Sequence, residues 1–103
     1  MAHQMTTKIR HIHSSADWDM VRGNITRLLF GLTAYNVSLL CRVEQLIPII
    51  DAKVEELDGL EHDWCNVVRH NPDCFSTLLA EVNTAIDEVD KAMTFLILAD
   101  RSN

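Results

Sequence analysis

Glycine and proline are scarce in this sequence, which contains three and two of them among its 103 residues. Folds built from many short strands need frequent turns, and turns are rich in these two residues, so a turn-rich β fold is not expected. The hydrophobic fraction of 48% is typical of a globular chain and too high for a disordered one. Because the length suits one domain, we expect a single all-α domain.

Basic residues are also in short supply, since nine Lys and Arg stand against fifteen Asp and Glu, giving a net charge of −6. Binding nucleic acid through direct phosphate contacts requires a basic surface, so this class of function is not expected. The imbalance is uneven: residues 1–47 hold five basic and three acidic side chains, whereas residues 48–103 hold four and twelve. This charge favours a protein partner with a basic surface.

The chain lacks a hydrophobic run long enough to cross a membrane. Its most apolar stretch, residues 28–41, spans about 14 residues, and about 20 are needed to cross roughly 30 Å of hydrocarbon. Three cysteines, an odd number with no signal-peptide pattern ahead of them, indicate free thiols rather than disulfides. We expect a cytoplasmic protein without a membrane span.

Signature motifs of enzymes are missing as well. The sequence has no zinc-protease motif, phosphate-binding loop, dinucleotide fingerprint or nucleophile elbow. It also lacks the paired Glu-x-x-His motifs of a di-iron bundle, and a thiol nucleophile would need a histidine held against it inside a cleft. We therefore expect no catalytic residue and no cofactor, and we interpret the protein as non-enzymatic.

The first thirteen residues show no helical period, so we expect residues 1–13 to form a flexible arm ahead of one helical domain over residues 14–103. Ser14, with Asp17 three residues later, is a variant of the capping box that starts a helix. Beyond it, apolar residues recur at alternating steps of three and four, which is typical of a coiled-coil seam. The first part of this seam comprises Trp18, Val21, Ile25, Leu28, Leu32, Tyr35 and Leu39.

The seam then continues from Val43 to Trp64, after a skip that resembles a coiled-coil stutter. Pro48 lies inside it, but its neighbours, in the stretch LIPII, include no turn-forming residue. This favours one long helix over about residues 15–69 with a kink at Pro48. The alternative is that Pro48 begins a new helix, which would give a compact three-helix bundle.

Asn71, Pro72 and Asp73 mark the clearest helix boundary in the sequence. The residue before a proline is disfavoured in helical conformation, whereas proline suits the first turn of a new helix. We therefore predict a second helix over about residues 72–99, antiparallel to the first in a coiled-coil-like hairpin. Its seam comprises Phe75, Leu79, Val82, Ile86, Val89, Met93 and Leu96.

A long kinked helix would leave the seam of its first half, from Trp18 to Leu39, without a partner in the chain. A second copy would cover it, and we therefore expect a homodimer. The stretch from Phe95 to Leu98 is apolar on every side, so we assign Phe95 and Leu98 to the same dimer or partner surface. The alternative is that these faces fill the core of a monomeric bundle.

Two histidines and two cysteines lie within residues 62–74, which raises the question of a metal site. Their spacing matches no standard zinc motif, and on a helix His62 would lie nearly opposite the core-facing Trp64. We therefore expect no metal site. Only Cys65, His70 and Cys74 would be close enough to bind one together, and only with a connection that curls inward.

An acidic stripe is predicted along the outer face of the second half of the long helix, and it comprises Asp51, Glu55, Asp58, Glu61 and His62. The stripe either keeps the protein soluble or binds a basic partner. The preferred hypothesis is a small acidic adaptor or inhibitor, of the kind that a virus or mobile element carries. The alternatives are a secretion-type chaperone or assembly subunit that holds an amphipathic helix, and a metal-responsive helical regulator.

Overall fold

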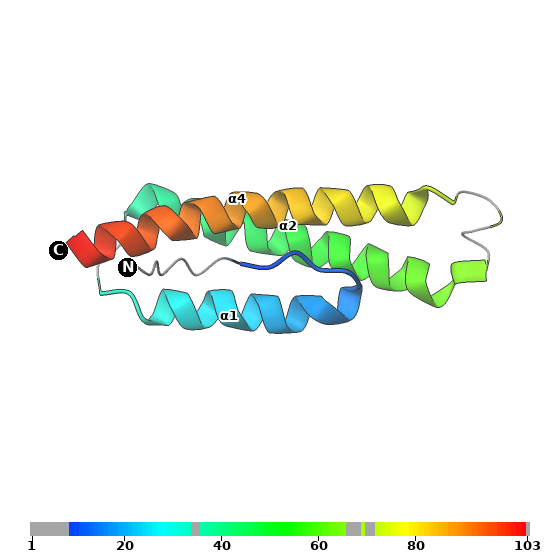
Figure 1. Cartoon of the computed structure of the whole chain (residues 1–103), viewed down its shortest axis with the longest axis horizontal. Coiled ribbons are helices and arrows are strands. Elements are labelled where there is room, and N and C mark those ends of the chain that lie inside the picture. Colours follow the sequence, from blue (N-terminus) through cyan, green and yellow to red (C-terminus); the bar gives the residue numbers. More distant parts are fainter. Residues whose placement is uncertain (1–8, 34–35, 66–68, 70–71, 103) are drawn as a thin grey trace, which may run out of the picture.

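The structure of the chain, a computed structural model, describes residues 9–33, 36–65, 69 and 72–102. The all-α fold predicted from the sequence is confirmed, and the described residues contain no strand (Figure 1). A short 3-10 helix is followed by three long helices, and these elements are η1 (Ser15–Asp17), α1 (Trp18–Phe30), α2 (Val37–His62) and α4 (Cys74–Ser102).

Helices α2 and α4 form the predicted antiparallel hairpin, and they lie side by side over most of their length (Figure 1). Both predicted seams face the core, in which the residues buried from these helices are Val43, Ile50, Val54, Leu57, Leu78, Val82, Ile86, Val89, Ala92, Met93 and Leu96. Two ion pairs bridge the helices: Arg42 to Glu88 at 2.8 Å and Lys53 to Glu81 at 3.1 Å. The heptad pattern therefore predicted the central hairpin correctly.

Helix α2 passes through Pro48 without a break, as predicted. Proline removes one backbone donor, and its ring crowds the carbonyl of the residue four positions earlier, which here is Glu44. Both Pro48 and Glu44 are exposed, so water can hydrate that carbonyl. The alternative in which Pro48 begins a new helix is wrong about Pro48, but the three helices that it predicted are present, because the chain breaks before α2 instead.

The prediction of one continuous helix over residues 15–69 is also wrong, because the chain leaves the helix between Phe30 and Val37. The side chain of Asn36 accepts a hydrogen bond from the Leu39 backbone N–H at 3.2 Å and so caps the start of α2. Thr33 donates from its backbone N–H and its hydroxyl to one carboxylate oxygen of Asp100, at 2.9 and 2.8 Å. These bonds hold the connection against the end of α4.

Helix α2 ends at His62 rather than near residue 69, but the described residues that follow Asp63, namely Trp64, Cys65 and Arg69, are helical again. Asp63 leaves the helical conformation, and the polar stretch over residues 61–63 offers no apolar side chain that would prolong the seam. Trp64, predicted to face the core, is 47% exposed, and its ring meets Phe75 edge to face with centroids 5.5 Å apart. The start of α4 at Cys74 agrees with the predicted boundary within two residues.

Because the chain reverses before α2, α1 packs back onto the hairpin. Trp18, Val21 and Ile25 are buried inside the single chain, and Leu28, Leu32 and Leu39 are partly buried against the same core. Their assignment to a dimer or partner surface is therefore corrected: this seam finds its partner within the chain. Tyr35, the remaining member, lies outside the described residues.

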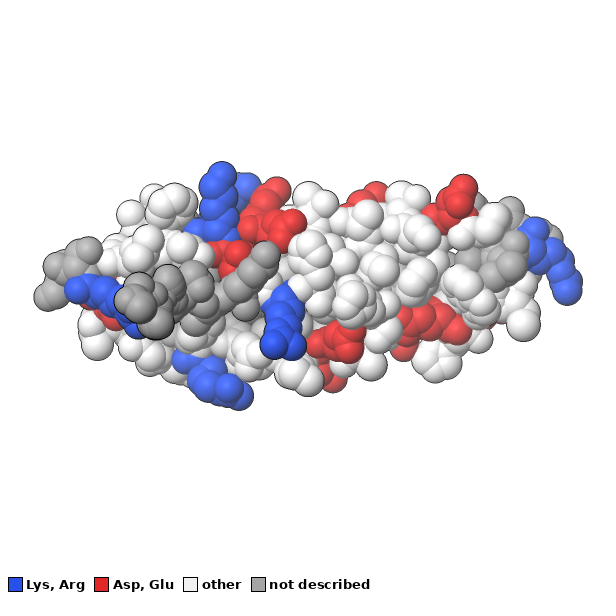
Figure 2. Space-filling model, viewed as in Figure 1, with Lys and Arg blue, Asp and Glu red and all other residues white. Residues whose placement is uncertain are grey.

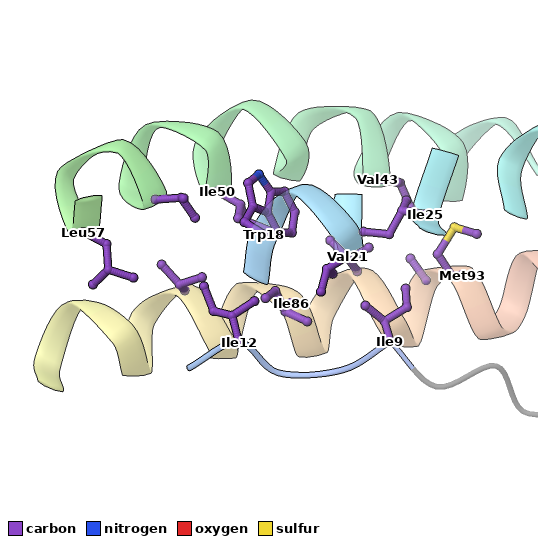
Figure 3. Close-up of a cluster of buried hydrophobic side chains, with 14 of the residues drawn as sticks. Ile9, Ile12, Trp18, Val21, Ile25, Val43, Ile50, Leu57, Ile86 and Met93 are labelled. Atoms are coloured by element: carbon purple, nitrogen blue, oxygen red, sulfur yellow. The ribbon is translucent and has the colours of Figure 1, made fainter. Parts of the chain in front are cut away.

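Residues 9–13 form an extended segment, here called the strap, that lies along α1 and α4 (Figure 1). Ile9 and Ile12 point from the strap into the hydrophobic cluster, where Ile12 has no exposed surface (Figure 3). The predicted flexible arm is therefore wrong for residues 9–13, because two isoleucines three residues apart fill the core. Residues 1–8 of that arm lie outside the described residues.

A row of polar side chains on α4 holds the strap in place. Asp90 accepts from the Ile9 backbone N–H at 2.9 Å, and Asn83 accepts from the Ile12 backbone N–H at 2.8 Å and donates to its carbonyl at 3.0 Å. Between them, His11 and Asp87 are 2.7 Å apart. These contacts run in opposite directions along the two segments, so the strap is antiparallel to α4.

Candidate functional site

A depression lies between α2 and α4 at the hairpin tip, and we call it the tip groove. It has a volume of about 560 Å³ and is lined by Glu56, Gly59, Leu60, Asp73, Cys74, Thr77, Leu78 and Glu81. Three of these residues are acids, and Leu60 and Leu78 supply apolar surface beside them. The groove therefore combines negative charge with an apolar floor.

The local structure explains why these residues meet. Helices α2 and α4 are antiparallel, and the ion pair between Lys53 and Glu81 places the last turns of α2 beside the first turns of α4. The Asp73 carbonyl accepts from the Thr77 backbone N–H at 3.0 Å, so Asp73 stands at the N-terminus of α4, where the helix dipole favours its charge. Gly59 keeps the α2 side open, because a Cβ placed there would meet no atom within 4 Å.

The charges of the tip groove are only partly neutralised. Glu81 is paired with Lys53 at 3.1 Å, whereas the carboxylates of Glu56 and Asp73 form no hydrogen bond or ion pair with any described residue. Both of these acids are exposed. The groove thus presents three carboxylates against one ammonium group and is net negative.

The predicted acidic stripe is not an open binding face, because three of its five members hold the N-terminal part of the chain. Asp51 accepts from the Trp18 indole N–H at 2.7 Å and pairs with Arg22 at 3.2 Å. Glu61 accepts from the Ser15 backbone N–H at 2.8 Å and from its hydroxyl at 2.6 Å.

Asp58 is the third of these acids, and the same Ser15 hydroxyl lies 3.3 Å from it. The sequence predicted that Ser14 would cap the first helix, but its side chain makes no capping bond there. The carboxylate of Glu61 supplies that cap from another helix. Of the predicted stripe, only Glu55 and His62 make no contact with another segment within the described part of the chain.

The side chain of His62 is 78% exposed and interacts with its own helix. Its Nδ1 donates to the Asp58 carbonyl oxygen at 2.8 Å and lies 3.4 Å from the Asp58 carboxylate. The hydrogen bond to the backbone carbonyl, followed by the negative charge of Asp58, raises the pKa of His62 above its ordinary value.

A second depression, here called the far groove, lies between the same two helices toward the other end of the molecule. It has a volume of about 400 Å³ and is lined by Leu39, Arg42, Glu88, Lys91, Ala92 and Phe95. Phe95 is 52% exposed and Leu98 is 55% exposed, and their assignment to a dimer or partner surface stays a prediction. The far groove therefore carries an exposed aromatic ring, the cation of Lys91, and the ion pair of Arg42 with Glu88 at 2.8 Å.

The distribution of charge follows the long axis of the molecule. On the face shown in Figure 2, most Lys and Arg side chains lie in the half where α4 finishes, with one at the hairpin-tip end, and acidic side chains are spread from beside these basic groups toward the hairpin tip. The two grooves lie at opposite ends of this gradient, since the tip groove is acidic and the far groove contains Arg42 and Lys91.

Within the described residues, no three His, Cys, Asp or Glu side chains lie close enough to hold a metal ion together. Cys65 is exposed and Cys74 is half-buried in the wall of the tip groove. His70, the third candidate ligand, lies outside the described residues. The three-residue site, which was the alternative to the expected absence of a metal, therefore stays untested because one of its members is not described.

Among the described residues, no helix has the length and hydrophobicity needed to cross a membrane. No protein-family model, curated protein or solved structure matches the chain. The function therefore has to be inferred from the shape and the charge of the two grooves.

Proposed function

We propose that the protein is a non-enzymatic interaction module, an acidic helical adaptor or inhibitor, whose tip groove binds a basic segment of a partner protein. The observation that carries this proposal is the arrangement of Glu56, Asp73 and Glu81 around the apolar floor formed by Leu60 and Leu78. This replaces the predicted acidic stripe by a site on a neighbouring face of the same helix.

The chemistry of the tip groove matches that of a lysine or arginine side chain. Such a side chain has an aliphatic stem that packs on apolar surface and a charged end that seeks a carboxylate. Leu60 and Leu78 suit the stem, and the unpaired carboxylates of Glu56 and Asp73 suit the cation. The net charge of −6 adds a long-range attraction that speeds encounter with a basic surface.

A binding measurement with a defined probe tests this proposal. The probe is a synthetic amphipathic helical peptide with Lys and Arg on one face and Leu on the other, titrated into the full chain in a calorimeter. The Glu56→Lys, Asp73→Lys double variant is expected to weaken binding by about tenfold, which corresponds to about 1.4 kcal/mol. The same peptide with Glu in place of Lys and Arg is expected not to bind.

The matched control is Asp19→Lys, which makes the same charge change as each single groove variant, Glu56→Lys or Asp73→Lys, but on exposed helix α1, away from the groove. It lowers the net negative charge without touching the site, so its effect is expected to be smaller and to vanish at high salt. Equal losses from Asp19→Lys and from each groove variant would show that only overall charge matters, and the proposal would then fail.

A second candidate function is the secretion-type chaperone or assembly subunit, and the far groove favours it. Phe95 and Leu98 are more than half exposed on the last helix, and Leu39 and Ala92 continue the apolar surface. Such a surface suits the apolar face of a partner's amphipathic helix. Binding of this kind is expected to survive high salt and to be lost in Phe95→Asp or Leu98→Asp.

A further inference from the structure

Three residues of α2 form a straight line along the face that carries both grooves. Arg42, Ile49 and Glu56 are spaced by seven residues, which places them within about 40° of one another around the helix and about 21 Å apart from end to end. Arg42 lines the far groove and Glu56 lines the tip groove. Ile49, between them, is 49% exposed although it is a large apolar residue.

This line faces away from α1. Asp51, which contacts Trp18 and Arg22 on α1, lies about 160° from Ile49 around α2. The line is therefore not used in the packing of α1, and it has a cation at one side of Ile49 and an acid at the other. Arg42 donates to Glu88 of α4 through Nη2 at 2.8 Å, and its guanidinium group has further N–H donors for a second carboxylate. A surface with this order of charges is complementary to itself when one copy is reversed.

We propose that two copies of this chain associate through the α2–α4 face in an antiparallel homodimer centred on Ile49. In this arrangement the two Ile49 side chains pack on each other. Arg42 of each copy faces Glu56 of the other copy, so the two-fold symmetry gives two equivalent pairs. The parallel arrangement would place Arg42 against Arg42 and Glu56 against Glu56, so like charges disfavour it.

The same reversal matches the two grooves. The far groove of one copy, with Lys91 and the exposed ring of Phe95, comes to lie over the tip groove of the other, which offers Asp73 and an apolar floor. Charge complementarity and exposed apolar surface therefore both favour a second copy of this chain as the partner of this face. This dimer differs from the one predicted from the sequence, because the seam of α1 takes no part in it.

The dimer covers the tip groove, so a second copy and a basic partner compete for the same carboxylates. The inference does not rest on the proposed function, since it is tested on the purified chain alone. A dimer that forms while the basic peptide fails to bind would leave this inference standing and remove only the proposed function. Peptide binding to a strictly monomeric chain would support the proposed function and remove only the dimer.

Sedimentation equilibrium of the full chain is the first test, with an expected mass of twice 11.7 kDa at high concentration. Arg42→Glu and Glu56→Arg are each expected to weaken the dimer at least about tenfold, whereas the double variant, with both charges exchanged, regains most of the affinity. Thermal unfolding of each variant separates this effect from the loss of the ion pair between Arg42 and Glu88.

A cross-linking test locates the centre of the interface. In a chain with Cys41, Cys65 and Cys74 replaced by Ser, Ile49→Cys is expected to form a disulfide between copies when diamide accepts the two electrons and two protons of the thiols. The control is Val37→Cys, which lies on the same helix but off the line and is 71% exposed, more than Ile49. It is expected to remain uncross-linked.

The outcomes are decisive in both directions. A dimer that is weakened by each single charge variant, restored by the exchange and cross-linked at position 49 supports the inference. A chain that stays monomeric at all concentrations overturns it, as does a dimer that ignores the charge exchange or cross-links equally at position 37.

Discussion

The carboxylate of Glu61 receives two hydrogen bonds from Ser15, one from the backbone N–H at 2.8 Å and one from the hydroxyl at 2.6 Å. The start of the first helix is thus capped by an acid 46 residues away in sequence. This contact turns a residue that resembled part of a binding stripe into one that fixes the fold. It also explains why the site for a partner has to be sought elsewhere on α2.

The first prediction concerns this cap. Glu61→Ala leaves the Ser15 backbone N–H without its acceptor in a partly buried position, and is expected to lower the free energy of unfolding by about 1–2 kcal/mol. Glu55→Ala, an exposed acid of the same stripe, is expected to change it by less than about 0.5 kcal/mol. Urea denaturation of the two variants gives both values, and equal values would contradict a capping role for Glu61.

The second prediction concerns the strap. Ile12 has no exposed surface, and Ile12→Ala is expected to lower the free energy of unfolding by about 2–4 kcal/mol through lost burial and an added cavity. Val37→Ala, at an exposed site, is the control and is expected to have a small effect. A small effect of Ile12→Ala in the same urea titration would show that the strap is not part of the core.

The third prediction concerns pH and His62. Its pKa is raised in the folded chain by the bond to the Asp58 carbonyl and by the Asp58 charge, so the protonated form stabilises the fold. This stabilisation is fully present below the unfolded pKa of about 6.5 and is lost as the pH rises through the raised folded value. His62→Gln is therefore expected to be less stable than the unmodified chain in acid, with the difference shrinking above that range.

Titration of the His62 ring followed by NMR checks the cause directly. The folded chain is expected to titrate above the value of the unfolded chain, and Asp58→Asn is expected to bring the pKa part of the way back, because the backbone hydrogen bond remains. A folded pKa at or below that of the unfolded chain would refute the interpretation.

The fourth prediction uses the two helical glycines, Gly23 and Gly59, both of which have open space where a Cβ would lie. Replacing either by Leu is expected to stabilise its helix by about 0.5–1 kcal/mol, since glycine is a poor helix former. Only Gly59→Leu fills the tip groove, so only this variant is expected to weaken binding of the basic peptide. If both variants bind the peptide equally well, the groove is not its site.

The sequence predicted the hairpin well because the apolar residues of both helices recur at a regular spacing. Residues such as Ile50 and Val89 recur at heptad spacing over several turns, and a long regular seam has few other ways to be buried. The break before α2 was missed because its signals, Gly31 and Asn36, lie inside an apolar stretch that continues the pattern. The cap formed by Asn36 is the signal that would have placed the break.

The strap and the tip groove were beyond the reach of such patterns. Ile9 and Ile12 are too few to show a period, and their burial depends on polar partners on α4 that are more than 70 residues away. Glu56 and Glu81 line the same groove because of the hairpin register. Sequence spacing alone does not reveal which face of α2 remains open once α1 has packed. Tertiary contacts therefore decided which acids are available to a partner.

The proposed binding of a basic segment is tested most directly by following the backbone amides of the isotope-labelled chain by NMR while the basic peptide is added. The largest shifts are expected around Glu56 and Leu60 on α2 and around Asp73 and Leu78 on α4, and in the Glu56→Lys, Asp73→Lys double variant they are expected to require about tenfold more peptide. Shifts centred on Phe95 and Leu98, or no shifts even with a large excess of peptide over protein, would contradict binding of a basic segment in the tip groove.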